Sequence, residues 1–185
     1  MNLLFLLVLF TSLILPTAAA AQNREEIPFV PTPIEVVDKM LELAELKKND
    51  LLYDLGSGDG RIVIHAAKKY GARAVGIEAD SSLIAKARST AKAEGVSHLV
   101  EFRAEDALKA DLSPATVITL YMLPWFNDAM KPSFKRLLKS GTRIVAHDFG
   151  IEGWEPDKTV KLPDPEIKNG GYKHYHTLFL WRIKK

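Results

Sequence analysis

Cysteine is missing altogether from this sequence of 185 residues, and its absence removes several kinds of chemistry at once. No disulfide can form, and no thiolate can act as a nucleophile or a metal ligand. A large excess of one sign of charge is also missing, because the net charge is only +2 at pH 7. Proteins that bind nucleic acid are usually far more basic, so we expect no nucleic-acid partner.

Long apolar runs are missing too, except at the start of the chain. Leu3–Leu15 is apolar apart from Thr11 and Ser12, and Ala18–Ala21 follow before any charged side chain. The run is shorter than the roughly 20 residues of a spanning helix, and the alanines fit a cleavage site. We interpret residues 1–21 as a signal peptide of an exported, periplasmic protein, or alternatively as a membrane anchor. Residues 22–27 form a polar linker, and residues 28–185 form one domain.

The most informative stretch is Leu51–Arg61, LLYDLGSGDGR. Its first residues are typical of a buried parallel strand, and three glycines follow at Gly56, Gly58 and Gly60. Apolar residues then recur at helical spacing through Lys69. Glycines let a ligand approach the main chain closely, and a helix start offers free N–H donors. The sequence therefore predicts a ligand site at this turn.

Several ligands do not fit this turn. Arg61 stands where the dinucleotide fingerprint requires its third glycine, and no Lys-Ser/Thr pair follows at P-loop spacing. A calcium loop would need oxygen ligands at the positions of Gly56 and Gly58. A tight turn without a ligand remains the alternative, although three glycines and two aspartates exceed what a simple turn needs.

Three motifs carry a resemblance to a known family. DLGSGDGR, VGIEAD at Val75–Asp80 and RAEDA at Arg103–Ala107 resemble the motifs of class I, seven-strand S-adenosylmethionine-dependent methyltransferases. FVPTP at Phe29–Pro33 and SGTRIVAHDF at Ser140–Phe149 are similar to segments of two groups of enzymes. These are the small protein-lysine methyltransferases of archaea and the mitochondrial enzyme that methylates a lysine of the ATP synthase c-subunit.

The resemblance implies an α/β fold, a doubly wound, mostly parallel, Rossmann-like sheet of seven strands with a C-terminal antiparallel strand pair. Apolar and β-branched runs in the chain match this order. The strands expected after Leu51–Leu55 are Ala72–Glu78, Leu99–Phe102, Ala115–Leu120, Thr142–Ala146, Lys158–Lys161 and Tyr175–Ile183. A turn is expected at Asn169 and the two glycines after it, and an amphipathic helix over Asn127–Lys139 that Pro132 breaks or kinks.

A further helix is expected just after the linker. Thr32 can cap it, with Pro33 at the first helical position and Glu35 completing a capping box. The resemblance adds that this part of the chain lies over the cofactor, so that Phe29 and Pro31 help to wall the site.

The cofactor implied by the resemblance is S-adenosylmethionine. The residues expected to bind it are Asp54, Gly56, Ser57, Gly58, Glu78 and Asp106. The three residues of the turn present their backbone to the amino-acid part, and Asp54 reaches its ammonium group. Glu78 holds the ribose hydroxyls, or alternatively is only a helix N-terminal charge. Asp106 accepts the adenine amine, with Glu105 one residue away and a solvated loop acid as the alternative.

The acceptor side is less defined. Tyr121 and Trp125 follow the fourth strand and form either the walls of a substrate channel or part of the core. Asp148 and His147 end the fifth strand, where ligand crevices form in open α/β sheets, although His147 can equally be structural. The Asn/Asp-Pro-Pro-Tyr/Phe motif of base and glutamine methyltransferases is absent, as is the acidic metal cluster of catechol-type enzymes. We expect no metal here.

The resulting hypothesis is a monomeric S-adenosylmethionine-dependent protein-lysine N-methyltransferase. Its substrate is a lysine side chain, on a membrane protein if the leader anchors the domain. The alternatives are a methyltransferase of a small molecule or lipid, and a cofactor-binding envelope protein without catalysis.

Overall fold

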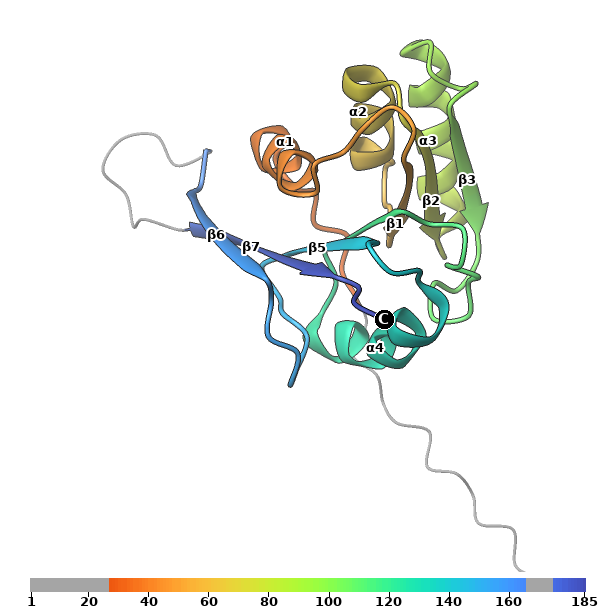
Figure 1. The fold of residues 1–185 in the computed structure, drawn as a ribbon. Helices are drawn as coiled ribbons and strands as arrows, with labels where there is room; N and C mark the ends of the chain where they lie inside the picture. Colours follow the sequence, from red (N-terminus) through yellow and green to blue (C-terminus); the bar gives the residue numbers. More distant parts are fainter. Residues whose placement is uncertain (1–26, 166–174) are drawn as a thin grey trace, which may run out of the picture.

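The computed structural model describes residues 27–165 and 175–185. The described residues form one seven-stranded sheet with helices on both faces (Figure 1). The helices are α1 (Ile34–Leu43), α2 (Arg61–Tyr70), α3 (Ser81–Ala93) and α4 (Pro124–Leu137). The strands are β1 (Leu51–Leu55), β2 (Arg73–Glu78), β3 (Val100–Ala104), β4 (Val117–Leu120), β5 (Arg143–His147), β6 (Lys158–Pro163) and β7 (Tyr175–Arg182). The predicted leader and the predicted turn at Asn169 lie outside the described residues.

The strand order is β3-β2-β1-β4-β5-β7-β6. The first five strands are parallel, while β7 runs antiparallel to both β5 and β6. The predicted doubly wound sheet with a C-terminal antiparallel pair is therefore confirmed. The order reverses between β1 and β4, and such a switch point opens a crevice at the carboxyl ends of the strands.

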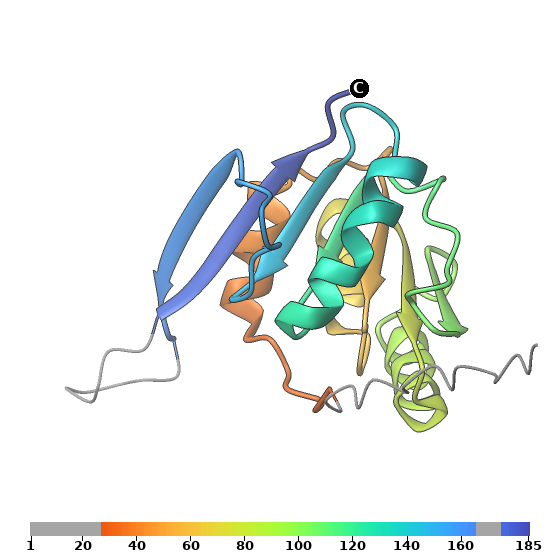
Figure 2. The same cartoon turned by 90° about the horizontal axis from the view of Figure 1, so that it is seen from below.

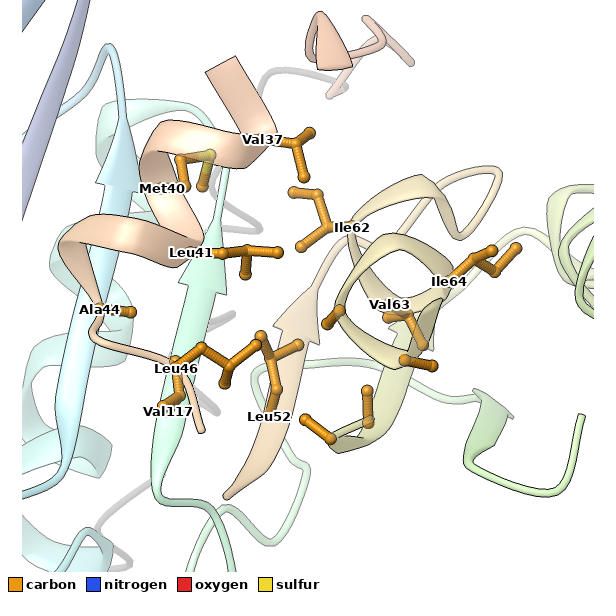
Figure 3. Packing of buried hydrophobic residues seen from close by; sticks show 14 of the residues in the cluster. Val37, Met40, Leu41, Ala44, Leu46, Leu52, Ile62, Val63, Ile64 and Val117 are labelled. Atoms are coloured by element: carbon orange, nitrogen blue, oxygen red, sulfur yellow. The ribbon is translucent and has the colours of Figure 1, made fainter. Parts of the chain in front are cut away.

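Two apolar cores flank the sheet. Helices α1, α2 and α3 cover one face, and α4 covers the other, as the two views show (Figures 1 and 2). Side chains along β1 alternate between the faces, because successive residues of a strand point to opposite sides. Leu52 packs under α1 and α2 beside Val117 of β4 (Figure 3), while Tyr53 and Leu55 belong to the core on the α4 side.

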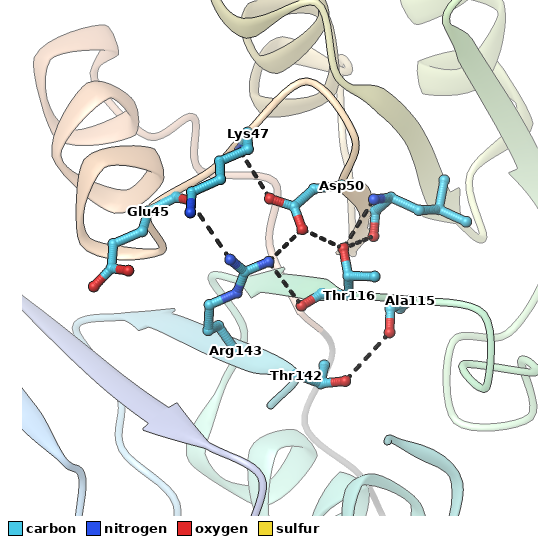
Figure 4. A network of polar contacts seen from close by, with 8 residues as sticks. Glu45, Lys47, Asp50, Ala115, Thr116, Thr142 and Arg143 are labelled. Carbon is cyan, nitrogen blue, oxygen red and sulfur yellow. Dashed lines mark hydrogen bonds and ion pairs between the residues drawn. The ribbon is translucent and has the colours of Figure 1, made fainter. Parts of the chain in front are cut away.

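A polar network closes the end of the sheet at which the parallel strands begin (Figure 4). Asp50 accepts hydrogen bonds from the Lys47 N–H at 2.8 Å and from the Thr116 hydroxyl at 2.7 Å, and it pairs with Arg143. Thr116 also accepts the Leu51 N–H at 2.9 Å. The network ties together the starts of β1, β4 and β5, and leaves their opposite ends for the ligand crevice.

Two helix starts differ from the sequence prediction. Helix α1 begins at Ile34, with Pro33 as its N-cap and without a capping hydrogen bond from a side chain. The capping box at Thr32 is therefore wrong, because the Thr32 hydroxyl instead pairs with Nδ1 of His147 at 3.2 Å. Helix α4 begins at Pro124, since proline suits the first helical position, and it continues through Pro132.

None of the helices in the described part of the chain combines the length and the apolarity that crossing a membrane requires.

Candidate active site

The glycine bend after β1 is the centre of the site. Gly56, Gly58 and Gly60 have φ angles of +73°, +53° and +79°, a left-handed conformation that favours glycine. The Gly56 and Ser57 N–H groups both donate to the Ile77 carbonyl, at 2.9 and 3.0 Å, which fastens the bend to β2. The glycines therefore place main chain with few side chains at the end of β1, beside the point where the strand order reverses.

A cavity of about 870 Å³ opens over this bend, a volume within the range of small-molecule sites. Its walls come from the bend, the carboxyl ends of β2 and β4, the loop after β3 and the segment before α1. The lining includes all of the residues assigned to the cofactor from sequence: Asp54, Gly56, Ser57, Gly58, Glu78 and Asp106. The structure therefore brings them together, while their individual roles stay predictions.

Glu78 is held firmly at the edge of the bend. Its Oε2 accepts the Gly58 N–H at 2.9 Å, and its Oε1 accepts the Asp80 N–H at 3.0 Å. Asp80, and not Glu78, caps α3 by accepting the Ser82 N–H at 2.7 Å. Each carboxylate oxygen has two lone pairs, so both Glu78 oxygens retain one for a ligand hydroxyl.

Asp54 lies beneath the bend and is buried. The Thr119 hydroxyl donates to its Oδ1 at 2.8 Å. Burial, together with the nearby negative charges of Glu78 and Asp59, raises the pKa of Asp54 to about 7 against the opposing effect of that hydrogen bond. Such a carboxyl group gains most from a cation, because a positive charge would restore its ionised form.

Asp106 lies across the cavity in the loop after β3. Its Oδ1 accepts the Leu108 N–H at 3.0 Å, and its Oδ2 is 3.4 Å from Lys109 Nζ. Glu105 also lines the cavity, so both acids considered for the adenine amine are at this wall.

The segment Ile27–Thr32 forms the outer wall and is fastened to the bend. Arg61 donates to the Thr32 carbonyl at 2.9 Å, and its guanidinium grips both oxygens of Asp59 at 3.0 and 2.8 Å. Phe29 lies so close to the bend that a Cβ on Gly58 would be 2.4 Å from its ring. Arg61, which stands where a dinucleotide fingerprint would have glycine, therefore has a structural role: it fastens the outer wall to the bend.

The side of the cavity predicted to receive the methyl acceptor is aromatic. Tyr121 and Trp125 line the cavity, and the Tyr121 ring lies 4.0 Å from the His147 ring and 6.3 Å from the Phe149 ring, between centroids. Asp148 was expected at the site but is absent from the cavity lining. Its φ of +59° turns it toward β7, where its Oδ1 accepts the Thr177 N–H at 2.8 Å.

Residues 54–158, more than half of the chain, match the ANTKMT methyltransferase domain. The chain belongs to this methyltransferase family. The resemblance that the motifs indicated is therefore confirmed, and the cavity over the glycine bend is the candidate active site of a methyltransferase.

Relatives of this methyltransferase include enzymes whose names state that they methylate lysine. A protein-lysine N-methyltransferase of Saccharolobus islandicus is 39% identical over 158 residues, which cover 85% of this chain and 94% of the relative. The human lysine N-methyltransferase named for the C subunit of ATP synthase is 32% identical over 142 residues, 77% of this chain and 60% of that protein. A solved structure, described as an RNA methyltransferase from Salinibacter ruber in complex with S-adenosyl-L-homocysteine, shares 52% identity with a TM-score of 0.75. The match covers 83% of this chain and 94% of that one.

Sequence reasoning missed three features of this methyltransferase site. Arg61 fastens the outer wall, Met122 packs on the bend so that a Cβ on Gly56 would meet its sulfur at 2.3 Å, and Thr32 pairs with His147. Of these three, only Arg61 was noticeable in the sequence, because a charged residue stands there in place of the third glycine of the dinucleotide fingerprint.

Proposed function

We propose that this methyltransferase uses S-adenosylmethionine to methylate lysine side chains of a protein. The observation that carries the proposal is the Glu78 carboxylate, which Gly58 and Asp80 hold at the rim of a cavity large enough for a nucleoside with an amino-acid arm. The cavity has acids along its inner wall and aromatic rings on its other side, which suits a cationic nucleoside at one end and an amine at the other.

The residues present fit this cofactor. Its ammonium group suits Asp54, whose pKa is raised by burial and by neighbouring acids, and its two ribose hydroxyls suit the remaining lone pairs of Glu78. The Ser57 hydroxyl is buried at the cavity and has no hydrogen-bond partner among the described residues, so it can also bind a polar group. Asp106, on the opposite wall, would accept the adenine amine. When bound, the cofactor supplies a methyl group on a positively charged sulfur.

The protein must also help the acceptor lose a proton. A free lysine has a pKa of about 10.4, so deprotonation at pH 7 costs about 4.6 kcal/mol. Tyr121 and Trp125 lower this cost by excluding water, since desolvation disfavours an ammonium group. Most of the acceleration then comes from holding the amine in line with the methyl group.

Relatives support a protein acceptor over the alternatives. The relatives from Saccharolobus islandicus and human are named as lysine methyltransferases, whereas the Salinibacter ruber protein is named as an RNA methyltransferase. The net charge of +2 does not provide the strongly basic surface that RNA binding usually requires, which favours protein. RNA, lipid and small molecules remain acceptors that the test must distinguish.

The test is transfer of radiolabelled methyl groups from S-adenosylmethionine to separate protein, lipid, RNA and small-molecule fractions. We expect label in protein, recovered as methyl-lysine after acid hydrolysis. Glu78→Gln should lose most transfer, whereas Glu94→Gln, a carboxylate that pairs with Lys68 on the surface, should keep it. Label only in lipid, RNA or small molecules would overturn the lysine acceptor, and cofactor binding without any transfer would indicate a non-catalytic protein.

We also propose that residues 1–21 direct the domain to or across a membrane, as a cleaved signal peptide or as an anchor. Mass spectrometry of the native protein locates its first residue. A start near Gln22 would support cleavage, an intact start in the membrane fraction would support the anchor, and an intact start in the soluble fraction would contradict both.

A further inference from the structure

A second cluster of reactive side chains lies behind the aromatic wall, outside the cavity lining. It combines His147 at the end of β5, Asp148 directly after it, and His176 near the start of β7. These two strands are antiparallel neighbours, so residues 29 positions apart in the chain meet side by side. His147 is fully buried and His176 nearly so, whereas Asp148 is partly open to solvent.

Three potential ligand atoms converge in this cluster. His147 Nε2 is 2.9 Å from His176 Nδ1, and Asp148 Oδ2 is 3.3 Å from the first nitrogen and 3.4 Å from the second. In a tetrahedral zinc site with bonds of about 2.0–2.1 Å, neighbouring ligand atoms are about 3.4 Å apart. The three atoms therefore form one face of such a tetrahedron with little adjustment.

A single hydrogen between the two rings leaves two acceptor atoms of this cluster close together. Two N–H groups pointing at each other across 2.9 Å would repel, so at most one hydrogen lies between the two rings. At least one nitrogen lone pair then faces a carboxylate lone pair of Asp148 at close range. A cation in the middle would accept all three lone pairs.

The surroundings hold the three atoms in place, as the outer shell of a metal site does. The Thr32 hydroxyl pairs with Nδ1 of His147, which leaves Nε2 to face the cluster. The other oxygen of Asp148 accepts the Thr177 N–H, and Asp164 Oδ1 is 3.8 Å from Nε2 of His176. Asp148 itself adopts a φ of +59°, a strained conformation for a residue with a side chain.

We propose that His147, Asp148 and His176 bind a divalent transition-metal cation of the Zn²⁺ type, with water in the fourth position. Two imidazoles and one carboxylate suit zinc better than calcium or magnesium, which prefer all-oxygen sites. The ion would fasten β5, β7 and, through Thr32, the segment before α1. Because the Tyr121 ring packs on His147, the same ion would fix one wall of the active site.

The test uses the full chain without a polyhistidine tag, freed of metal by a chelator and titrated with Zn²⁺ against a chromophoric indicator. We expect one equivalent to bind tightly and to raise the melting temperature. His176→Gln should lose both effects, while His65→Gln, a surface histidine paired with Asp38, should behave as the wild type. Thr32→Val should keep the site but weaken it by about 10–100-fold, the usual effect of an outer-shell change.

Binding of S-adenosyl-L-homocysteine by His176→Gln serves as the check that the variant is folded. If that variant does not fold, the comparison of variant with wild type is replaced by the visible spectrum of the metal-free wild type after Co²⁺ is added. The intense visible bands of a four-coordinate site would support the proposal, and the pale spectrum of hydrated Co²⁺ would overturn it. Failure of the wild type to bind Zn²⁺, or equal binding by His176→Gln, would also overturn it, and neither result would affect the proposed methyl transfer.

Discussion

At the scale of single residues, Glu78 and Asp54, which we propose bind the cofactor, are held at the cavity in opposite ways. Glu78 is at the rim, and two backbone N–H groups fix its carboxylate. Asp54 is buried below the bend with one hydroxyl partner, and its pKa is raised to about 7. The first acid is already oriented for neutral hydroxyl groups, whereas the second gains most from a positive charge.

Replacing Glu78 by alanine should weaken cofactor binding by about 1.5–3 kcal/mol, the contribution of hydrogen bonds to a charged group. The change also leaves the Gly58 N–H without its acceptor in the bend. Calorimetric titration with S-adenosylmethionine measures the effect, and Glu94→Ala on the surface is the matched control. Unchanged affinity in Glu78→Ala would refute the ribose role.

Replacing Asp54 by asparagine should change the pH dependence of stability. The folded-state pKa is about 7 and the ordinary value is 3.8, so the folded protein retains a proton that the unfolded chain releases between these values. Stability of the cofactor-free protein should therefore fall as pH rises from about 4 to 7, by up to roughly 4 kcal/mol from this group. Asp54→Asn cannot ionise and should remove that fall.

Melting temperatures of both proteins across this pH range check the prediction. The variant should be the more stable protein at pH 8 and yet bind the cofactor more weakly, because it lacks a charge for the ammonium group. Parallel pH profiles would show that Asp54 does not titrate as described.

At the scale of elements, the site depends on a bend and on a segment that lies over it. The bend supplies bare main chain, and the segment Ile27–Thr32 supplies the outer wall. Arg61 joins them through Asp59 and the Thr32 carbonyl. The contact of Phe29 with Gly58 leaves no room for a side chain at the centre of the bend.

Gly58→Ala should damage cofactor binding beyond its effect on stability. The backbone at Gly58 has a φ of +53°, which costs a residue with a Cβ about 1–2 kcal/mol, and the new Cβ would displace the Phe29 ring. Gly95→Ala is the control, because Gly95 has a φ of +73° with no heavy atom within 4 Å of an added Cβ. Both variants should lose stability in thermal unfolding because of the backbone strain, and Gly58→Ala should lose more because the Phe29 ring must move. Only Gly58→Ala should lose affinity for S-adenosyl-L-homocysteine, by about tenfold or more, and equal affinities would contradict the assignment.

Elements built from local pattern were predictable from sequence, whereas those that depend on distant partners were not. The apolar run before the glycines predicted β1, and the run Ala72–Glu78 predicted β2 with Glu78 at its end. Thr32 was misread as a cap because its true partner, His147, is 115 positions away in the chain. His176 lies in a strand with no motif around it, so only the pairing of β5 with β7 shows its position beside His147.

At the scale of the whole molecule, the two ends of the sheet have different roles. The carboxyl ends of the parallel strands carry acids, glycines and the cavity. The opposite ends are joined by Asp50, Thr116 and Arg143 (Figure 4). Burial opposes ionisation of Asp50, but its hydrogen bonds with Thr116, Lys47 and Arg143 outweigh burial and lower its pKa. Its contribution to stability is therefore present at neutral pH and lost in acid below the ordinary pKa of 3.8.

Asp50→Ala should destabilise the protein without disturbing the active site. Arg143 would keep its charge in a largely buried position without its carboxylate partner, a loss of about 3 kcal/mol. Thermal unfolding at pH 7 should show a melting temperature lower by roughly 6–12 °C for a chain of this size. Cofactor affinity measured below the transition should be unchanged, and a large loss of affinity would indicate that the two ends of the sheet are coupled.

The central claim is that the glycine bend, with Glu78 and Asp54 beside it, binds a sulfonium nucleoside. The most direct measurement is calorimetric titration of the purified wild type with S-adenosylmethionine and with S-adenosyl-L-homocysteine. We predict saturable binding of both at one site per chain, weakened in Glu78→Ala and intact in Glu94→Ala. Absence of binding to a folded wild type, with either compound in large excess, would contradict the claim.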